Sequence, residues 1–178
     1  AIATVFRDGN ESGTRYSVIK NSEFFNFVNM GIDIEASYEN YRMLNPSGNV
    51  IENNYFHVPG SSILFEGDGS YWYEQSGVRN VQVRNNMFDN CLYGCKTWGD
   101  AHIAYNSRIS EQEKSRYHKN IVVEGNTFRT FDPRILYLCC FDGITYRNNK
   151  IEQSNDYVFN REETNPFVIK HCDNVTIE

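Results

Sequence analysis

Residues 81–88 read VQVRNNMF, and they follow residues 63–69, which read ILFEGDG. In residues 81–88, Val81 and Val83 alternate with polar residues, which is the two-residue period of a strand with one buried face. Two asparagines, which tolerate left-handed turn conformations, then end the strand, and Phe88 returns to the apolar side. The pattern predicts a short strand, an asparagine turn and the start of a second strand.

This unit recurs along the chain. Four further copies read VIKNSEF, VIENNYF, IVVEGNTF and ITYRNNKI, and they begin at Val18, Val50, Ile121 and Ile144. Another copy begins at Asn174. The closing Phe or Ile residues stand at positions 24, 56, 88, 128 and 151, in steps of 32, 32, 40 and 23 residues. Steps of this size indicate a repeat architecture.

The predicted fold is all-β, a single-stranded parallel β-helix, or solenoid. The shortest step leaves room for about three short strands and their turns, which is one coil of such a helix. Longer steps are coils with loop insertions, gathered on one flank. The asparagines would stack as a hydrogen-bonded ladder beside a stack of phenylalanines. An antiparallel sandwich is the alternative, but the double asparagine before Phe does not suit a two-residue hairpin.

Length and composition limit the classes of function. The chain has 178 residues, enough for one domain over residues 1–178. A net charge of −6 argues against nucleic acid or an anionic membrane as partner, and no apolar run is long enough to span a membrane. Because the chain starts and stops within the repeat, we expect a fragment of a longer solenoid, with oligomer contacts through its ends or flank. The five cysteines suggest buried free thiols, with a Cys91–Cys95 disulfide as the alternative.

The candidate chemistry is acidic. Aligning Ile32 with Ile63 places Glu35 opposite Glu66, with Asp68 two residues further on. Strands of adjacent coils lie about 4.8 Å apart, so these carboxylates would share one site and one pKa would rise. Glycoside hydrolysis needs a protonated acid and a carboxylate, and a diagonal pair approaches the roughly 6.5–9.5 Å spacing of inverting enzymes. A solvated acidic outer face is the alternative.

Aromatic residues next to these acids favour a sugar ligand, because a sugar's C–H face packs on a ring. The candidate substrate-binding residues are Tyr71, Trp72, Glu74, Arg79, Trp98, Asp100 and His102. Arg79 could instead pair with Glu74, and we expect a histidine such as His102 to be a surface residue more often than a ligand.

Several motifs resemble one family. They are GDGSYWYE at 67–74, GVRNV at 77–81, NNMFDNC at 85–91, Trp98-Gly99, and HKNI at 118–121. Together they resemble glycoside hydrolase family 110, bacterial α-1,3-galactosidases on a right-handed parallel β-helix.

The resemblance implies inverting, exo-acting release of terminal α-linked galactose from an oligosaccharide or glycan, without a metal or other cofactor. It gives the first catalytic role to Asp68, inside the most specific run, and implies a periplasmic or extracellular bacterial location. Which carboxylate is acid and which is base stays open. Two alternatives remain: a non-catalytic carbohydrate-binding β-helix of the tail-spike or adhesin type, and a structural solenoid with no ligand.

Overall fold

The computed structural model describes residues 4–6, 16–25, 31–35, 37–39, 42–44, 47–66, 77–94, 99–106, 116–159 and 161–178. Every regular element in these ranges is a β-strand. Within them, no helix has the length and apolar character that a membrane crossing needs.

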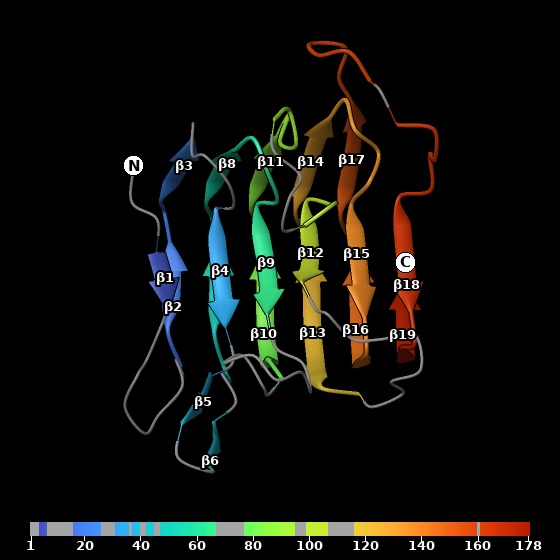
Figure 1. The fold of residues 1–178 in the computed structure, drawn as a ribbon. Coiled ribbons are helices and arrows are strands. Elements are labelled where there is room, and N and C mark those ends of the chain that lie inside the picture. The colour runs from blue at the N-terminus through green and yellow to red at the C-terminus, as the bar shows by residue number, and fades with distance from the viewer. Residues whose placement is uncertain are drawn as a thin grey trace.

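Three parallel sheets make up the fold (Figure 1). Sheet A contains β1 (Thr4–Phe6), β4 (Ile32–Glu35), β9 (Ile63–Glu66), β12 (Ile103–Asn106), β15 (Leu136–Cys139) and β18 (Phe167–Lys170). Sheet B contains β2 (Val18–Lys20), β7 (Val50–Glu52), β10 (Arg79–Arg84), β13 (His118–Glu124), β16 (Phe141–Arg147) and β19 (Asp173–Ile177). Sheet C contains β3 (Glu23–Phe25), β8 (Tyr55–His57), β11 (Met87–Asp89), β14 (Thr127–Thr130) and β17 (Lys150–Gln153). A small antiparallel pair, β5 (Ser37–Glu39) and β6 (Arg42–Leu44), stands apart from them.

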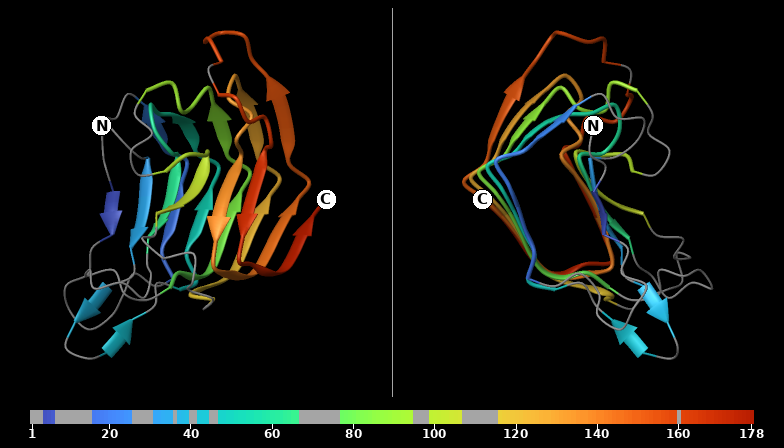
Figure 2. Two further views of the ribbon diagram at one scale, coloured as in Figure 1. Left: turned by 45° about the vertical axis from the view of Figure 1, so that its right-hand side comes forward. Right: turned by 90° about the vertical axis from the view of Figure 1, so that its left-hand side faces the viewer.

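The chain passes through sheets B, C and A in turn, and then returns to sheet B one strand further along. We call one such passage a rung, so that β10, β11 and β12 form the third. Seen end on, the sheets surround a central interior (Figure 2). The predicted all-β class with parallel strands is therefore confirmed.

The rungs pair in the predicted register. Phe24, Phe56, Phe88, Phe128 and Ile151 are successive Cα partners in sheet C. The four phenylalanine rings stack with centroids 4.8, 5.0 and 4.6 Å apart. The core is thus one continuous column of aromatic rings, flanked by the inward-facing apolar residues of sheets A and B.

The asparagine ladder is also confirmed. Where two asparagines follow a sheet B strand, the first and the second have different structural roles. The first residue takes a left-handed conformation, with φ of 54° at Asn53 and 55° at Asn85. The second is buried, and its Oδ1 accepts hydrogen bonds from the backbone N–H and the side-chain amide of the equivalent asparagine one rung earlier. This ladder runs through Asn54, Asn86, Asn126 and Asn149.

Cys91, Cys139 and Cys140 are buried free thiols, as predicted, and Cys172 is a free, partly buried thiol. Burial raises the pKa of Cys91 to about 11. Since Cys91 is free, the alternative of a Cys91–Cys95 disulfide is wrong.

Candidate functional site

The carboxyl ends of the sheet A strands carry the predicted acids. Glu35 and Glu66 are the last residues of β4 and β9, and they are direct Cα partners. Asn106 holds the same position in β12, opposite Glu66. Adjacent parallel strands lie about 4.8 Å apart, so two acidic residues from separate rungs occupy neighbouring places. The predicted alignment of these two rungs is confirmed, whereas Asp68 lies outside the described residues.

Arg79 belongs to the same corner of the fold, which we call the A–B corner because there each rung leaves sheet A and enters sheet B. It is the first residue of β10 and is the Cα partner of Lys119. Its Nε is buried and has no hydrogen-bond partner in the described part of the chain. Buried guanidinium N–H groups usually have an acceptor, so the Nε of Arg79 is an unusual polar group at this corner.

The outer face of sheet A is covered next to this corner. Leu64 and Ala104 occupy the outward positions that alternate with core residues of β9 and β12, yet both are fully buried. They pack with Ala101 and against Tyr137 in a small second cluster. Part of the outer face of sheet A is therefore apolar and covered.

The structure explains why two positions in the motifs that resemble the family are occupied by glycine. A Cβ on Gly77 would lie 1.7 Å from the backbone oxygen of Tyr117, in the next rung. A Cβ on Gly99 would lie 2.3 Å from Ser61 Oγ and 2.8 Å from the Ala104 side chain. Both positions need glycine because neighbouring chain passes too close for any side chain.

Asp100 and His102 lie at the other end of β12, where each rung passes from sheet C to sheet A; we call this place the C–A corner. Asp100 and His102 precede Ile103, the first residue of β12, whereas Asn106 is its last residue, so the length of the strand, roughly 10 Å, separates the two corners. The structure therefore does not bring Asp100 and His102 together with Glu35 and Glu66. The remaining candidates, which are Tyr71, Trp72, Glu74 and Trp98, lie outside the described residues.

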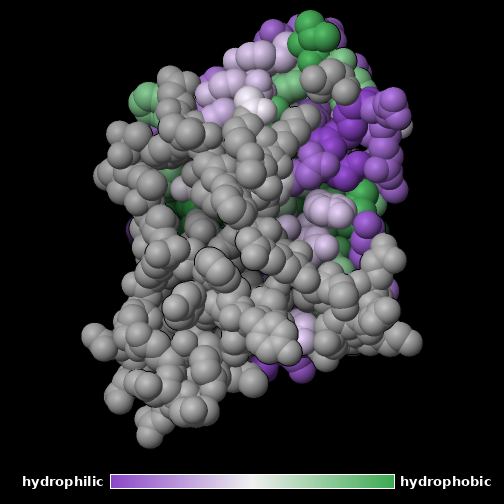
Figure 3. Space-filling view, in the orientation of Figure 1, coloured by the Kyte–Doolittle hydropathy of each residue, from purple (hydrophilic) through white to green (hydrophobic). Residues whose placement is uncertain are grey.

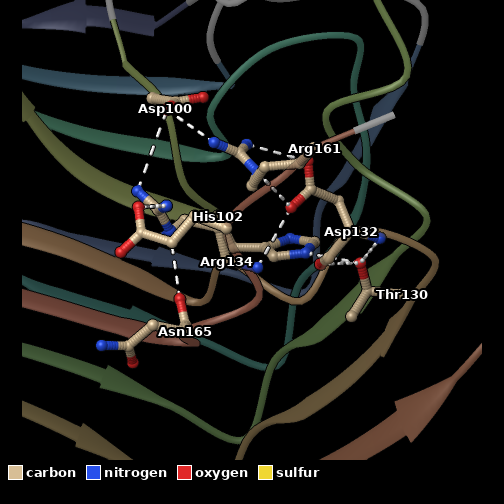
Figure 4. A network of polar contacts seen from close by, with 8 residues as sticks. Asp100, His102, Thr130, Asp132, Arg134, Arg161 and Asn165 are labelled. Atoms are coloured by element: carbon tan, nitrogen blue, oxygen red, sulfur yellow. Dashed lines mark hydrogen bonds and ion pairs between the residues drawn. The ribbon is translucent and has the colours of Figure 1, made fainter. Parts of the chain in front are cut away.

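Asp100 takes part in a network of charges (Figure 4). Its carboxylate accepts a hydrogen bond of 2.6 Å from Arg161 and lies 3.9 Å from Arg134. Arg161 also donates to both oxygens of buried Asp132, and Arg134 pairs with Glu163 at 2.6 Å. No local sequence pattern predicts this network, because Arg161 reaches Asp132 from the following rung across 29 residues.

His102 is fully buried, so the expectation of a surface residue was wrong. Its ring meets Phe88 and Phe128 edge-on, with centroids 6.3 and 5.6 Å away. Its Nε2 lies 2.9 Å from Thr130 Oγ1, whose hydroxyl already donates to the Asp132 carbonyl. Nε2 must therefore be the protonated, donating nitrogen. Burial lowers the pKa of His102 from 6.5 to about 4, although Asp132 opposes that shift.

This pKa predicts a specific loss of stability in acid. As the pH falls below about 6.5, His102 becomes protonated in the unfolded chain. In the folded chain it stays neutral until about pH 4. The free energy of unfolding should therefore decrease across this window, by about 3 kcal/mol. Urea unfolding of the wild type and of His102→Gln between pH 7 and 4 checks this. The variant should lack that decrease, whereas His171→Gln, at an exposed position, should keep it. Equal pH dependence in the wild type and His102→Gln would contradict the prediction.

No group of three or more His, Cys, Asp or Glu side chains in the described ranges is arranged to hold a metal ion. The protein is thus an all-β structure of parallel sheets, with paired acidic positions and a buried arginine donor at one corner.

The resemblance of the motifs to the α-1,3-galactosidase family is confirmed by similarity to several curated members over about three quarters of the chain, as expected for a fragment of that family. The chain is 36% identical over 141 residues to α-1,3-galactosidase B of Phocaeicola vulgatus, covering 75% of this chain and 23% of that protein. It is 38% identical over 134 residues to α-1,3-galactosidase A of Bacteroides fragilis, covering 72% of this chain and 22% of the relative. Against α-1,3-galactosidase B of Akkermansia muciniphila the identity is 32% over 136 residues, or 75% and 17% of the two chains. The chain spans a quarter or less of these relatives' length, and no family model matches it.

Proposed function

We propose that residues 1–178 are one domain of a right-handed parallel β-helix in a glycoside hydrolase that releases terminal α-linked galactose by an inverting mechanism. The observation that carries this proposal is the register of Glu35 and Glu66 at the A–B corner, in a chain related to α-1,3-galactosidases. The three-sheet topology, with one strand from every rung in each sheet, supports the β-helix. The exo-acting specificity is what the resemblance to glycoside hydrolase family 110 implies.

We assign the two catalytic carboxyl groups to two of the three residues Asp68, Glu66 and Glu35. Direct neighbours in register are about 4.8 Å apart, closer than an inverting pair needs. The sequence leads us to expect a diagonal pair, at the roughly 6.5–9.5 Å that leaves room for a water, and this expectation favours Asp68 with Glu35 over Glu66 with Glu35.

In the reaction, the protonated carboxylic acid gives its proton to the glycosidic oxygen as the bond to the anomeric carbon breaks. The carboxylate takes a proton from a water, whose oxygen attacks that carbon from the opposite face. We assign a hydrogen bond with a sugar hydroxyl to Arg79, and the aromatic contacts to Tyr71, Trp72 and Trp98. Glu74 accepts hydrogen bonds from further hydroxyls.

The test uses the full-length protein and an α-1,3-linked galactobiose. Asp68→Asn and Glu35→Gln should reduce galactose release to background while binding of the disaccharide survives, since each removes a proton-transfer group and keeps its shape. Glu124→Gln, which changes an exposed acid of sheet B, is the matched control. NMR taken directly after mixing should show β-galactose first. Unchanged turnover in Asp68→Asn removes that residue from the mechanism, and α-galactose as first product overturns inversion.

A further inference from the structure

A cavity of about 590 Å³ lies at the C–A corner, away from the acids of the A–B corner. Its walls come from the chain after β14 and from the end of β17 with the segment that follows it. Phe131, Tyr157 and Phe159 supply aromatic surface. In Figure 3, apolar side chains at the top of the view lie over this segment between β17 and β18, next to a hydrophilic region. The volume is that of a small-molecule site.

The segment that forms one wall is anchored at two places. Near its start, Asp156 accepts hydrogen bonds from Arg129 and from Asn90 at 2.9 Å. Further on, Arg161 is bound by Asp100 and Asp132. Charged pairs on both sides of Tyr157 and Phe159 therefore hold this wall in place without a ligand, which reduces the entropy lost on binding.

The aromatic wall is also supported from behind. Tyr157 stacks on Tyr93 with centroids 5.4 Å apart and an angle of 15°, and Tyr93 stacks in turn on His57 at 5.0 Å. Phe131 contacts Tyr157 at 5.1 Å. The orientation of the Tyr157 ring is thus set by neighbours from three other rungs.

The polar side chains of the lining identify the class of ligand. Gln153, Asn155 and Thr164 line the cavity, and no hydrogen bond in the described part of the chain engages their side chains. No charged residue of the described ranges lines it, and the nearby cations Arg129 and Arg161 are already paired with carboxylates. A phosphate or carboxylate ligand would need an unpaired cation, and a lipid would leave the amides unsatisfied. Aromatic faces beside free amides and a hydroxyl suit a neutral polyol.

We propose that this cavity binds a neutral sugar unit of a glycan, as a second carbohydrate site separate from the acids of the A–B corner. The sugar's C–H face packs on the aromatic wall, and its hydroxyls exchange hydrogen bonds with Gln153, Asn155 and Thr164. The site holds no acid pair, so it binds the glycan and does not cleave it.

The experiment titrates the isotope-labelled 178-residue chain with α-1,3-linked galactobiose, and follows amide NMR shifts and the dissociation constant. Shifts should gather at residues 153–159. Phe159→Ala and Gln153→Ala should each weaken binding about fivefold to tenfold, as expected for one lost ring contact or hydrogen bond. Val158→Ala is the matched control, since Val158 lies between two lining residues, is 88% exposed and does not line the cavity. Galacturonic acid, which is charged, should bind more weakly than galactose.

Circular dichroism of each variant shows whether it folds. If Phe159→Ala does not fold, Gln153→Ala still tests the proposal, because Gln153 is at an exposed position. Trp72→Ala, which removes an aromatic contact that we assign to the A–B corner, should leave this binding unchanged. The proposal is overturned if no shifts appear at residues 153–159, or if Gln153→Ala and Phe159→Ala bind like Val158→Ala. If only Trp72→Ala weakens binding, the sugar binds at the A–B corner, and the proposed function stands without this second site.

Discussion

Replacing Phe88 by alanine should lower the free energy of unfolding by about 3–5 kcal/mol, the usual range for a buried phenylalanine. The Phe88 ring is fully buried and stacks on Phe56 on one side and on Phe128 on the other, at 5.0 and 4.6 Å. It also receives the edge of buried His102. Removal leaves a void in the middle of the aromatic column, where neighbours held in register by parallel strands have little freedom to collapse. The loss is a large part of the roughly 5–15 kcal/mol that stabilises a typical domain.

Urea unfolding followed by circular dichroism measures this effect in the 178-residue chain. Phe25→Ala is the matched control, because Phe25 is next to a column residue in β3 but is 51% exposed. Its change should stay below about 1 kcal/mol. Phe88→Leu should recover part of the loss, since it refills some of the void. A loss in Phe88→Ala no larger than that in Phe25→Ala would show that the column contributes little to stability.

The column and the ladder could be predicted from sequence because both depend on local patterns that recur. A left-handed residue, which is asparagine after most sheet B strands and Gly125 after β13, ends these strands in the same way, so the positions of Phe56, Phe88 and Phe128 follow from the repeated unit. Once these are stacked, the alignment of Glu35 with Glu66 follows as well, since both close the sheet A strand of their rung. Parallel stacking converts a shared sequence position into a shared place in space.

The surroundings of Asp100 and His102 could not be predicted in this way. Whether an acid next to a strand binds substrate or pairs internally depends on which loop returns to it, and Arg161 does so from 61 residues away. His102 stands just before a strand, where a turn to the interior or to solvent is equally compatible with the pattern. The cavity was missed for the same reason, because Phe131 and Tyr157 belong to segments outside the repeated unit and approach each other only through the fold.

Replacing Asp132 by alanine should also destabilise the chain strongly, by about 3–5 kcal/mol, the range for removing one partner of a buried ion pair. Asp132 is 1% exposed, accepts hydrogen bonds from Arg161 through both oxygens, and accepts the backbone N–H of Arg134 at 3.1 Å. Its loss leaves the mostly buried Arg161 guanidinium with only Asp100 as an anionic partner in the described part of the chain. The buried N–H of Arg134 also loses its acceptor, which adds to the cost.

Thermal and urea unfolding measure the loss, and Glu124→Ala provides the comparison. Glu124 pairs with Arg147 at 2.9 Å, but both side chains are at least one third exposed, so removing that pair should cost less than about 1 kcal/mol. The difference between the two variants isolates the effect of burial, since each removes one carboxylate that an arginine binds. Asp132→Asn separates charge from shape: it retains an acceptor for Arg134 while leaving Arg161 short of one anion, and it should lie between the other two. Equal stability of Asp132→Ala and Glu124→Ala would mean that Asp100 alone compensates Arg161, and that the anchor of the cavity wall does not depend on Asp132.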